Sequence, residues 1–236
     1  AGEGASVIVN DLGTTVGGAD SSARPADQVV REILDRGGRA APSYVSVADF
    51  QSAGEIVRTA IDEFGRLDIL CNSAGFLRDR MVFNMTEVEW DSVLQVHLYG
   101  AFNMVRNSVP YMMAHRHGRI VLFSSSSGLG AAGQANYAAA KEGMVGFARS
   151  LARELAEYGI TVNAVYPGAN TRMMAAVPES TRQRLRKQAK SAPGSVQGPA
   201  EIVASPEPEE ALAPENNAPK IVYLCTEDGG AMTGRV

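Results

Sequence analysis

A chain of 236 residues, 45% of them hydrophobic and 20% charged, has the composition of a globular domain large enough to bury a substantial core. The net charge of −4, with no long basic stripe, argues against a nucleic-acid partner. No apolar run reaches the roughly 18 to 20 residues of a membrane-spanning helix, and the three His and two Cys show no metal-ligand spacing. We therefore expect neither a membrane span nor a metal site.

The first predicted element is a strand over residues 5–10 with an apolar centre. Asp11 and Leu12 follow it directly. A carboxylate at the end of a strand can accept hydrogen bonds from both hydroxyls of an adenosine ribose, and it repels a 2′-phosphate. Asp11 therefore favours NAD over NADP, and the alternative is an ordinary turn-forming or helix-capping aspartate.

Residues 13–28 are rich in Gly, Ser and Ala without periodicity, which predicts a long exposed loop. A helix is expected after this loop and a glycine pair ends it. The next strand is expected over 41–47 and contains Ser46 and Val47 near its end. Asp49 is then the predicted N-cap of a helix that ends near residue 65.

A buried strand over 67–71 is followed by Asn72, Ser73, Ala74 and Gly75. Small residues at this point allow the backbone to approach a flat ligand, and the Asn side chain can link neighbouring strands. The sequence therefore places a second candidate ligand contact at the end of this strand.

Thr86 and Glu89 have the spacing of a capping box and predict the start of a long helix that carries His97. The helix is apolar on more than one side. Cys71 and Cys225 stand in apolar surroundings, which predicts buried free thiols in a reducing compartment and a cytoplasmic protein.

The most informative segment, residues 119–141, reads RIVLFSSSSGLGAAGQANYAAAK. An apolar strand leads into four serines, and an Ala-rich helix then carries Tyr137 and Lys141 at the i, i+4 spacing of one helix face. A cation one turn away is expected to lower the pKa of the phenol and make it a better acid–base group. A serine hydroxyl at the strand end could hold a substrate oxygen beside it.

This segment resembles the active site of the short-chain dehydrogenases/reductases, and the resemblance extends over nearly the whole chain. It implies an α/β fold with a doubly wound, parallel, Rossmann-type sheet in a single domain over 1–236. In that family a strand and a glycine-rich turn precede the strand expected at 5–10, and neither is present here. We therefore expect a chain that is fragmentary at both ends, with the family's last strand beginning at 233–236.

The resemblance also implies roles for the site residues. Tyr137 is the expected acid–base residue, and Ser125 the expected ligand of the substrate oxygen, although Ser124 or Ser126 could replace it. Lys141 would tune the tyrosine and bind the nicotinamide ribose. His97 stands where the family most often has an Asn that organises a relay water, so it is either a relay residue or a satisfied core histidine.

The remaining expected cofactor contacts follow from the same resemblance. Pro167 and Gly168 stand where the nicotinamide lies in the family, and Thr171 would hold its carboxamide. Ser46, beside Val47, replaces the Asp that usually touches the adenine. The resemblance implies NAD as the cofactor. The other residues expected to contact it are Asp11, Leu12, Asn72, Ala74, Gly75, Tyr137 and Lys141.

Several details resemble one branch of the family, the (3R)-hydroxyacyl-CoA dehydrogenase units of multifunctional β-oxidation enzymes. Residues 174–214, with a basic run over 181–190, are expected to form a substrate lid and mobile loop. The expected substrate is then a secondary alcohol or ketone, and this branch implies a 3-hydroxyacyl thioester of coenzyme A. The alternatives are a small ketone, steroid or terpene alcohol, or a non-catalytic cofactor-binding module. A homodimer or homotetramer is expected, as in the family.

Overall fold

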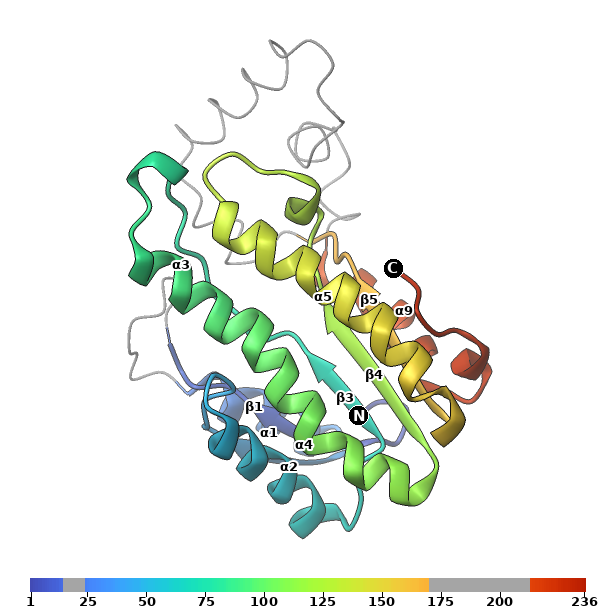
Figure 1. Ribbon diagram of the computed structural model, residues 1–236. Coiled ribbons are helices and arrows are strands. Elements are labelled where there is room, and N and C mark those ends of the chain that lie inside the picture. Colours follow the sequence, from blue (N-terminus) through green and yellow to red (C-terminus); the bar gives the residue numbers. More distant parts are fainter. Residues whose placement is uncertain (15–23, 170–212) are drawn as a thin grey trace.

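The computed structural model describes residues 1–14, 24–169 and 213–236, and within them strands alternate with helices (Figure 1). The strands are β1 (Ser6–Asn10), β2 (Arg39–Ser43), β3 (Ile69–Asn72), β4 (Gly118–Phe123) and β5 (Ile160–Val165). Every pairing is parallel, in two sheets of order β1-β2 and β3-β4-β5. The predicted parallel α/β fold is confirmed, and β1 and β3 are not hydrogen-bonded to each other.

Helices join these strands on both sides of the sheets. They are α1 (Pro25–Asp35), α2 (Phe50–Phe64), α3 (Glu87–Leu94), α4 (Gly100–His115), α5 (Ala135–Glu154) and α9 (Ala218–Cys225). A π-helical turn, Gln95–Tyr99, connects α3 to α4 in one continuous rod. Short 3-10 turns lie at Val82–Asn84, Ser126–Leu129, Ala156–Tyr158, Pro214–Asn217 and Asp228–Ala231. No helix in the described part of the chain is long and apolar enough to cross a membrane.

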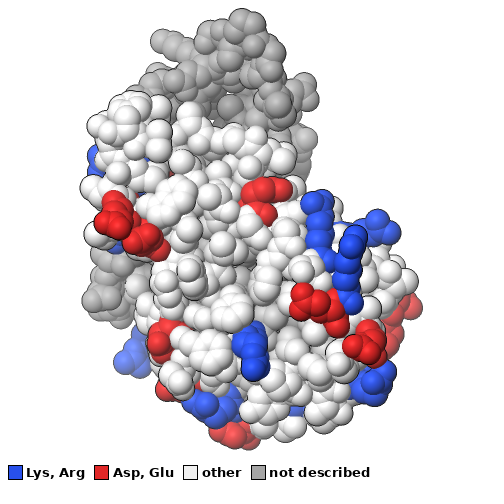
Figure 2. Space-filling view, viewed as in Figure 1, with Lys and Arg blue, Asp and Glu red and all other residues white. Residues whose placement is uncertain are grey.

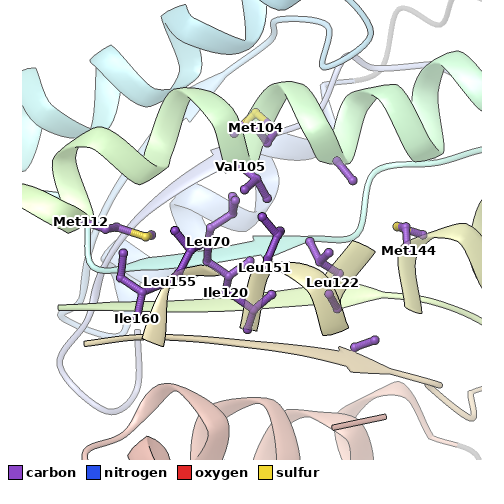
Figure 3. Close-up of a cluster of buried hydrophobic side chains, with 14 of the residues drawn as sticks. Leu70, Met104, Val105, Met112, Ile120, Leu122, Met144, Leu151, Leu155 and Ile160 are labelled. Atoms are coloured by element: carbon purple, nitrogen blue, oxygen red, sulfur yellow. The ribbon is translucent and has the colours of Figure 1, made fainter. Parts of the chain in front are cut away.

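The main core lies between the three-stranded sheet and the helices α4 and α5 (Figure 3). Successive strand residues point to opposite faces, so Ile120 and Leu122 of β4 enter this core together. They meet Met104 of α4 and Met144 of α5, and all four are almost completely buried. Each such side chain contributes about 1.5 to 3 kcal/mol on burial, so this layer holds α5 rigidly against the end of β4.

The opposite face of β4 carries Arg119, which is 4% exposed and anchors the C-terminal segment. Its Nε donates to the Thr226 carbonyl at 3.3 Å and its Nη1 to the Gly159 carbonyl at 3.3 Å. Its Nη2 lies 3.6 Å from the Glu227 carboxylate. The buried cation therefore ties α9 to the face of the sheet that α4 and α5 leave free.

The end signals of two helices are confirmed. Asp49 accepts the Ser52 N–H at 2.8 Å at the start of α2, and Gly65 ends that helix with the left-handed φ of 78°. The capping box of Thr86 and Glu89 is complete at the start of α3.

Some expected boundaries were wrong. The first helix begins at Pro25, inside the segment expected to be loop, because proline suits the first turn of a helix. Strand β2 occupies 39–43 instead of 41–47. The backbone of Val45 pairs instead with the side chain of Asn10, through bonds of 3.0 and 3.2 Å.

Residues 233–236, expected to begin a strand, run beside β5 without being part of the sheet. Gly234 N–H donates to the Val162 carbonyl at 2.8 Å, and the Arg235 carbonyl accepts from Ala164 N–H at 2.9 Å.

The expectation for the cysteines was wrong in one respect. Both thiols are free, but Cys71 is exposed and Cys225 only half-buried.

Several expected features lie outside the described residues, namely residues 15–23, Thr171, the basic run 181–190 and nearly all of the expected lid, 174–212. The expectations for these segments stay predictions.

Candidate active site

The carboxyl end of β4 and the start of α5 bring the predicted catalytic side chains together. The strand ends at Phe123, Ser124 and Ser125 follow it, and Tyr137 and Lys141 lie on the buried face of α5. Lys141 Nζ donates to the Phe123 carbonyl at 2.5 Å and lies 5.5 Å from the centre of the Tyr137 ring. The i, i+4 spacing therefore places both side chains on one helix face at the strand end.

The serines differ in what they contact. Ser124 is buried and its hydroxyl donates to the Lys141 carbonyl at 2.7 Å, which links the strand end to the helix. Ser125 accepts the Ser127 N–H at 3.2 Å, and its hydroxyl forms a hydrogen bond with Tyr137. The geometry therefore favours Ser125 over Ser124 as the partner of the phenol.

The pKa of Tyr137 is raised above its ordinary value. Burial is the largest cause and the charge of Asp79 adds to it, while the hydrogen bond with Ser125 opposes it. This direction is opposite to the lowering that the spacing of Tyr137 and Lys141 led us to expect. Low polarity penalises the phenolate more strongly than nearby groups stabilise it, so the residue is a neutral phenol at pH 7.

Burial also acts on Lys141, which is 4% exposed, and lowers its pKa to about 7. The amine therefore changes its charge close to neutral pH, within one helical turn of Tyr137. This accounts for the missing electrostatic effect on the pKa of the phenol, because a lysine with this pKa has already lost its charge where the phenol titrates.

His97 occupies the π-helical turn between α3 and α4 and is 1% exposed. Single π-helical turns are frequent at functional sites. Its ring stands edge-on to the Tyr137 ring at a centroid distance of 5.1 Å. Nε2 lies 2.9 Å from the Phe76 carbonyl and 3.2 Å from the Phe76 N–H, whereas the buried Nδ1 has no hydrogen-bond partner in the described part of the protein.

Burial and the charge of Lys141 lower the pKa of His97 to about 3, against a weaker raising effect of its bond to Phe76. The imidazole is therefore neutral at pH 7, and its Nδ1 is unpaired among the described residues. An unpaired buried nitrogen costs free energy, so His97 is not a fully satisfied core histidine, and its relay role stays a prediction.

The segment after β3 forms the wall opposite Tyr137. Asn72 is buried, and Ala74 packs on the main core. A methyl group at Gly75 would come within 2.0 Å of His97 Cε1, so the ring of His97 occupies the space that any larger residue needs. Phe76 then packs with Tyr137 in a small second cluster.

The residues expected at the adenosine end lie at the ends of β1 and β2. One carboxylate oxygen of Asp11 accepts the Gly13 N–H at 2.7 Å, so the turn-forming alternative is also realised. Leu12 is exposed. Ser46 accepts the Ala48 N–H at 3.2 Å, and the carbonyl of the buried Val47 accepts from Asn103 at 2.9 Å.

Pro167 and Gly168 follow β5 and are exposed, and the Gly168 carbonyl accepts from the Asn217 side chain at 3.0 Å. The ends of β3, β4 and β5 thus bring together small backbone segments, a hydroxyl pair and an amine at one edge of a parallel sheet, where α/β proteins bind their ligands. These residues fit the ribose and nicotinamide ends of a dinucleotide. Across the described residues, no group of three or more His, Cys, Asp or Glu side chains could hold a metal ion.

Sequence reasoning missed the contacts of Asn136. This residue is completely buried, and its Oδ1 accepts the Tyr137 N–H at 2.8 Å. Its Nδ2 donates to the carbonyls of Arg78, at 3.1 Å, and Glu89, at 2.9 Å. Only its position beside Tyr137 could have drawn attention to it, because both carbonyls lie far away in the sequence.

A parallel α/β fold with a Ser–Tyr–Lys group at the strand ends defines a nicotinamide-dependent oxidoreductase of the Rossmann class. The chain belongs to the short-chain dehydrogenase family, whose model matches residues 2–182. A solved structure described as a short chain dehydrogenase from Mycobacterium avium superposes with a TM-score of 0.78 at 36% identity, and it covers 100% of this chain and 75% of the other.

Its curated relatives are of different lengths. A short-chain type dehydrogenase/reductase of Mycobacterium tuberculosis is 42% identical over 97% of this chain and 71% of its own length. A peroxisomal hydratase-dehydrogenase-epimerase of Saccharomyces cerevisiae is 49% identical over 73% of this chain, but this covers only 19% of the yeast enzyme. A 3-oxoacyl-[acyl-carrier-protein] reductase of Thermotoga maritima is 39% identical over 77% of this chain and 75% of its own.

Proposed function

We propose that this chain carries the active site for reversible, NAD-dependent oxidation of a secondary alcohol, with a 3-hydroxyacyl thioester as substrate. The observation that carries the proposal is the buried group of Ser125, Tyr137 and Lys141 at the end of β4, with the neutral His97 against the phenol. A module that only bound a cofactor would have no use for an acid–base phenol in this setting.

The chain's own residues would hold the substrate oxygen and move its proton. Ser125 and Tyr137 share a hydrogen bond, so an alcohol or ketone oxygen can be held between the two hydroxyls. The neutral phenol of Tyr137 can protonate a ketone oxygen, and in the reverse direction it must first lose its proton. Lys141, whose pKa is lowered to about 7, provides the next site for that proton. A bound nicotinamide cofactor would accept or donate the hydride.

The preference for NAD over NADP rests on Asp11. Its carboxylate stands at the end of β1, with one oxygen bonded to Gly13 N–H. That bond fixes the direction of the carboxylate, so ribose hydroxyls would meet a prepared acceptor and a 2′-phosphate would meet a negative charge.

The thioester substrate is supported by the names of the relatives. They include enzymes named for 3-oxoacyl reduction and for hydratase-dehydrogenase-epimerase activity. In a 3-hydroxyacyl or 3-oxoacyl thioester, the reacting oxygen is on the third carbon of the acyl chain. This holds for thioesters of coenzyme A and of acyl-carrier protein alike. The cytoplasmic location proposed from the sequence can be checked by cell fractionation, since several relatives are named as peroxisomal.

We also propose a homo-oligomer formed through the outer face of α4. Phe102 of α4 is 46% exposed, and Tyr99 at the end of the preceding π-helical turn is 55% exposed. Phe102 packs with the exposed ring of Phe50 at a centroid distance of 6.4 Å. The face over α4 and α5 shows a wide area without charged side chains (Figure 2). Light scattering on the wild type and on Phe102→Arg would test this: a monomeric wild type contradicts it.

The function is tested by following NADH formation with the intact protein and (R)-3-hydroxybutyryl-CoA, the corresponding acyl-carrier-protein thioester and a simple secondary alcohol. We expect turnover of a thioester with a kcat/KM at least tenfold above that of the simple alcohol. Equal rates on all three substrates would overturn the thioester assignment. If none of the three substrates is turned over, the enzymatic proposal is overturned.

A further inference from the structure

The start of α5 is held to the loop that follows β3 by three separate links. Besides the bond from Asn136 to the Arg78 carbonyl, Gln134 Nε2 donates to Asp79 at 3.0 Å and the Gly133 carbonyl accepts the Arg80 N–H at 2.7 Å. We call this set of contacts, between residues 78–80 and 133–136, the clamp. It joins two segments more than 50 positions apart in the sequence.

Asn136 is the buried centre of the clamp. Its single amide satisfies three backbone groups: the N–H of Tyr137 and the carbonyls of Arg78 and Glu89. Glu89 belongs to α3, which also carries the capping box with Thr86. The bond to the Arg78 carbonyl ties the loop to α5, and the bond to the Glu89 carbonyl ties α3 to α5. Losing buried hydrogen bonds costs free energy, so the amide fixes how α3, the loop and α5 sit together.

We propose that Asn136 is a positioning residue that sets the place of the Tyr137 phenol by clamping the first turn of α5 to the loop over residues 78–80 and to α3. The inference rests on the proposed function for the catalytic use of Tyr137. The physical reason is direct: Tyr137 is the next residue in the chain, and its own backbone N–H is one of the three groups that the amide holds.

The clamp also controls what surrounds the phenol. Tyr137 is faced by Ser125 after β4, by Lys141 on its own helix, by His97 on the π-helical turn and by the charge of Asp79 on the clamped loop. His97 is neutral above about pH 3. A displaced loop would admit water and carry Asp79 away, and both changes lower the pKa of the phenol towards its ordinary value.

Two variants separate clamping from simple support of a helix start. Asn136→Ala removes all three bonds, whereas Asn136→Asp keeps an oxygen for the Tyr137 N–H but offers no donor to the two carbonyls. Asp is favourable in the first turn of a helix. If Asn136 only stabilised that turn, Asp would restore activity; if it clamps the loop, Asp would fail as Ala does.

Asn163 of β5 provides a matched control, since it is 1% exposed. Its Oδ1 accepts the Arg235 N–H at 3.1 Å and its Nδ2 donates to the Met232 carbonyl at 2.8 Å. Asn163→Ala and Asn163→Asp thus remove the same kind of buried amide bonds without contact to Tyr137.

The experiment compares kcat, KM, the pH profile of kcat and urea stability across these four variants of the intact protein. We expect both Asn136 variants to lose at least 30-fold in kcat, with KM for NAD within twofold and the alkaline limb of the profile shifted. We expect both Asn163 variants to keep kcat within threefold at a comparable loss of stability. Equal losses at the two positions, or full activity in Asn136→Asp, would overturn the proposal.

Two further measurements keep the inference testable. If the Asn136 variants do not fold, Gln134→Glu serves as the test, because it places a second carboxylate next to Asp79 at the partly exposed edge of the clamp. We expect this variant to lose at least fivefold in kcat. An unchanged kcat counts against the clamp. If no substrate is turned over, ultraviolet difference titration still reports the phenol, with Tyr137→Phe identifying its signal. A titration identical in wild type and Asn136→Ala would overturn the inference independently of the proposed function.

Discussion

In the three-stranded sheet, five of the six residues of β4 and five of the six of β5 are buried, whereas none of the five residues of β1 is. The proposed catalytic side chains are attached to the first region, and the proposed adenosine contacts to the second. The first region is held by core packing against α4 and α5. The second is a two-stranded parallel ladder, supplemented by side-chain bonds such as those from Gly13 N–H to Asp11 and between Asn10 and Val45.

The difference between the two regions predicts whether a substitution changes stability or ligand affinity. In a densely packed region, a change in volume alters stability and geometry at once. In a region held by local bonds on the surface, a change alters ligand affinity and leaves the fold intact.

The largest effect is expected for Tyr137→Phe, which removes only the phenol oxygen from the packed region. We expect kcat to fall at least about a thousandfold, or roughly 4 kcal/mol in barrier. The free energy of unfolding should change by only about 1 kcal/mol, because one hydrogen bond with Ser125 is lost. Steady-state kinetics and urea unfolding provide both numbers, and retention of more than a tenth of the activity would contradict the assigned role.

The second effect concerns volume at the site wall. A methyl group at Gly75 would lie 2.0 Å from His97 Cε1, so Gly75→Ala should cost about 2 to 3 kcal/mol in unfolding free energy and also reduce kcat. The matched control is Gly146→Ala in α5, where the added methyl group meets nothing within 4 Å. That variant should be neutral or up to about 1 kcal/mol more stable. Equal stabilities of the two variants would contradict the packing argument.

The third effect is a pH dependence that comes from Lys141. Its pKa is lowered from the ordinary 10.5 to about 7 in the folded protein, so the unfolded chain binds more protons between these two values. The free energy of unfolding should therefore rise as pH increases from about 7 to about 10.5. Lys141→Met should lack this rise and be inactive.

The control for Lys141 is Lys220→Met on the exposed side of α9, which should keep the wild-type dependence on pH. Urea unfolding at several pH values from 6 to 10 decides the matter. A wild type whose stability is flat over this interval would show that Lys141 keeps its charge in the folded protein.

The smallest effect is expected in the weakly packed region. In Asp11→Asn the amide oxygen can still accept the Gly13 N–H, so the turn is kept and only the charge is lost. The preference for NAD over NADP should fall about tenfold, or roughly 1.4 kcal/mol, with unfolding free energy unchanged within about 0.5 kcal/mol. Kinetics with both cofactors measure the ratio, and Asp35→Asn on the surface of α1 is the control. An unchanged ratio would remove Asp11 from cofactor selection.

Part of this fold could be predicted because its signals are local. Alternating or continuous apolar runs indicated all five strands, and the capping residues Asp49 and Thr86 marked helix starts to the residue. The i, i+4 spacing placed Tyr137 and Lys141 on one helix face, while the choice of Ser125 came from the family resemblance. In each case the decisive interaction spans only a few residues, so sequence neighbours are enough to define it.

What only the tertiary structure decided depends on contacts between distant segments. The neutral states of Tyr137 and His97 follow from burial under neighbouring elements, and no local pattern reports how much water a folded site excludes. The unpaired Nδ1 of His97 and the three bonds of Asn136 arise from packing partners far along the chain. The sequence by itself determined which groups this protein carries to one edge of its sheet, whereas the tertiary structure decided their charge and their alignment, because desolvation and long-range hydrogen bonds exist only once the chain has folded.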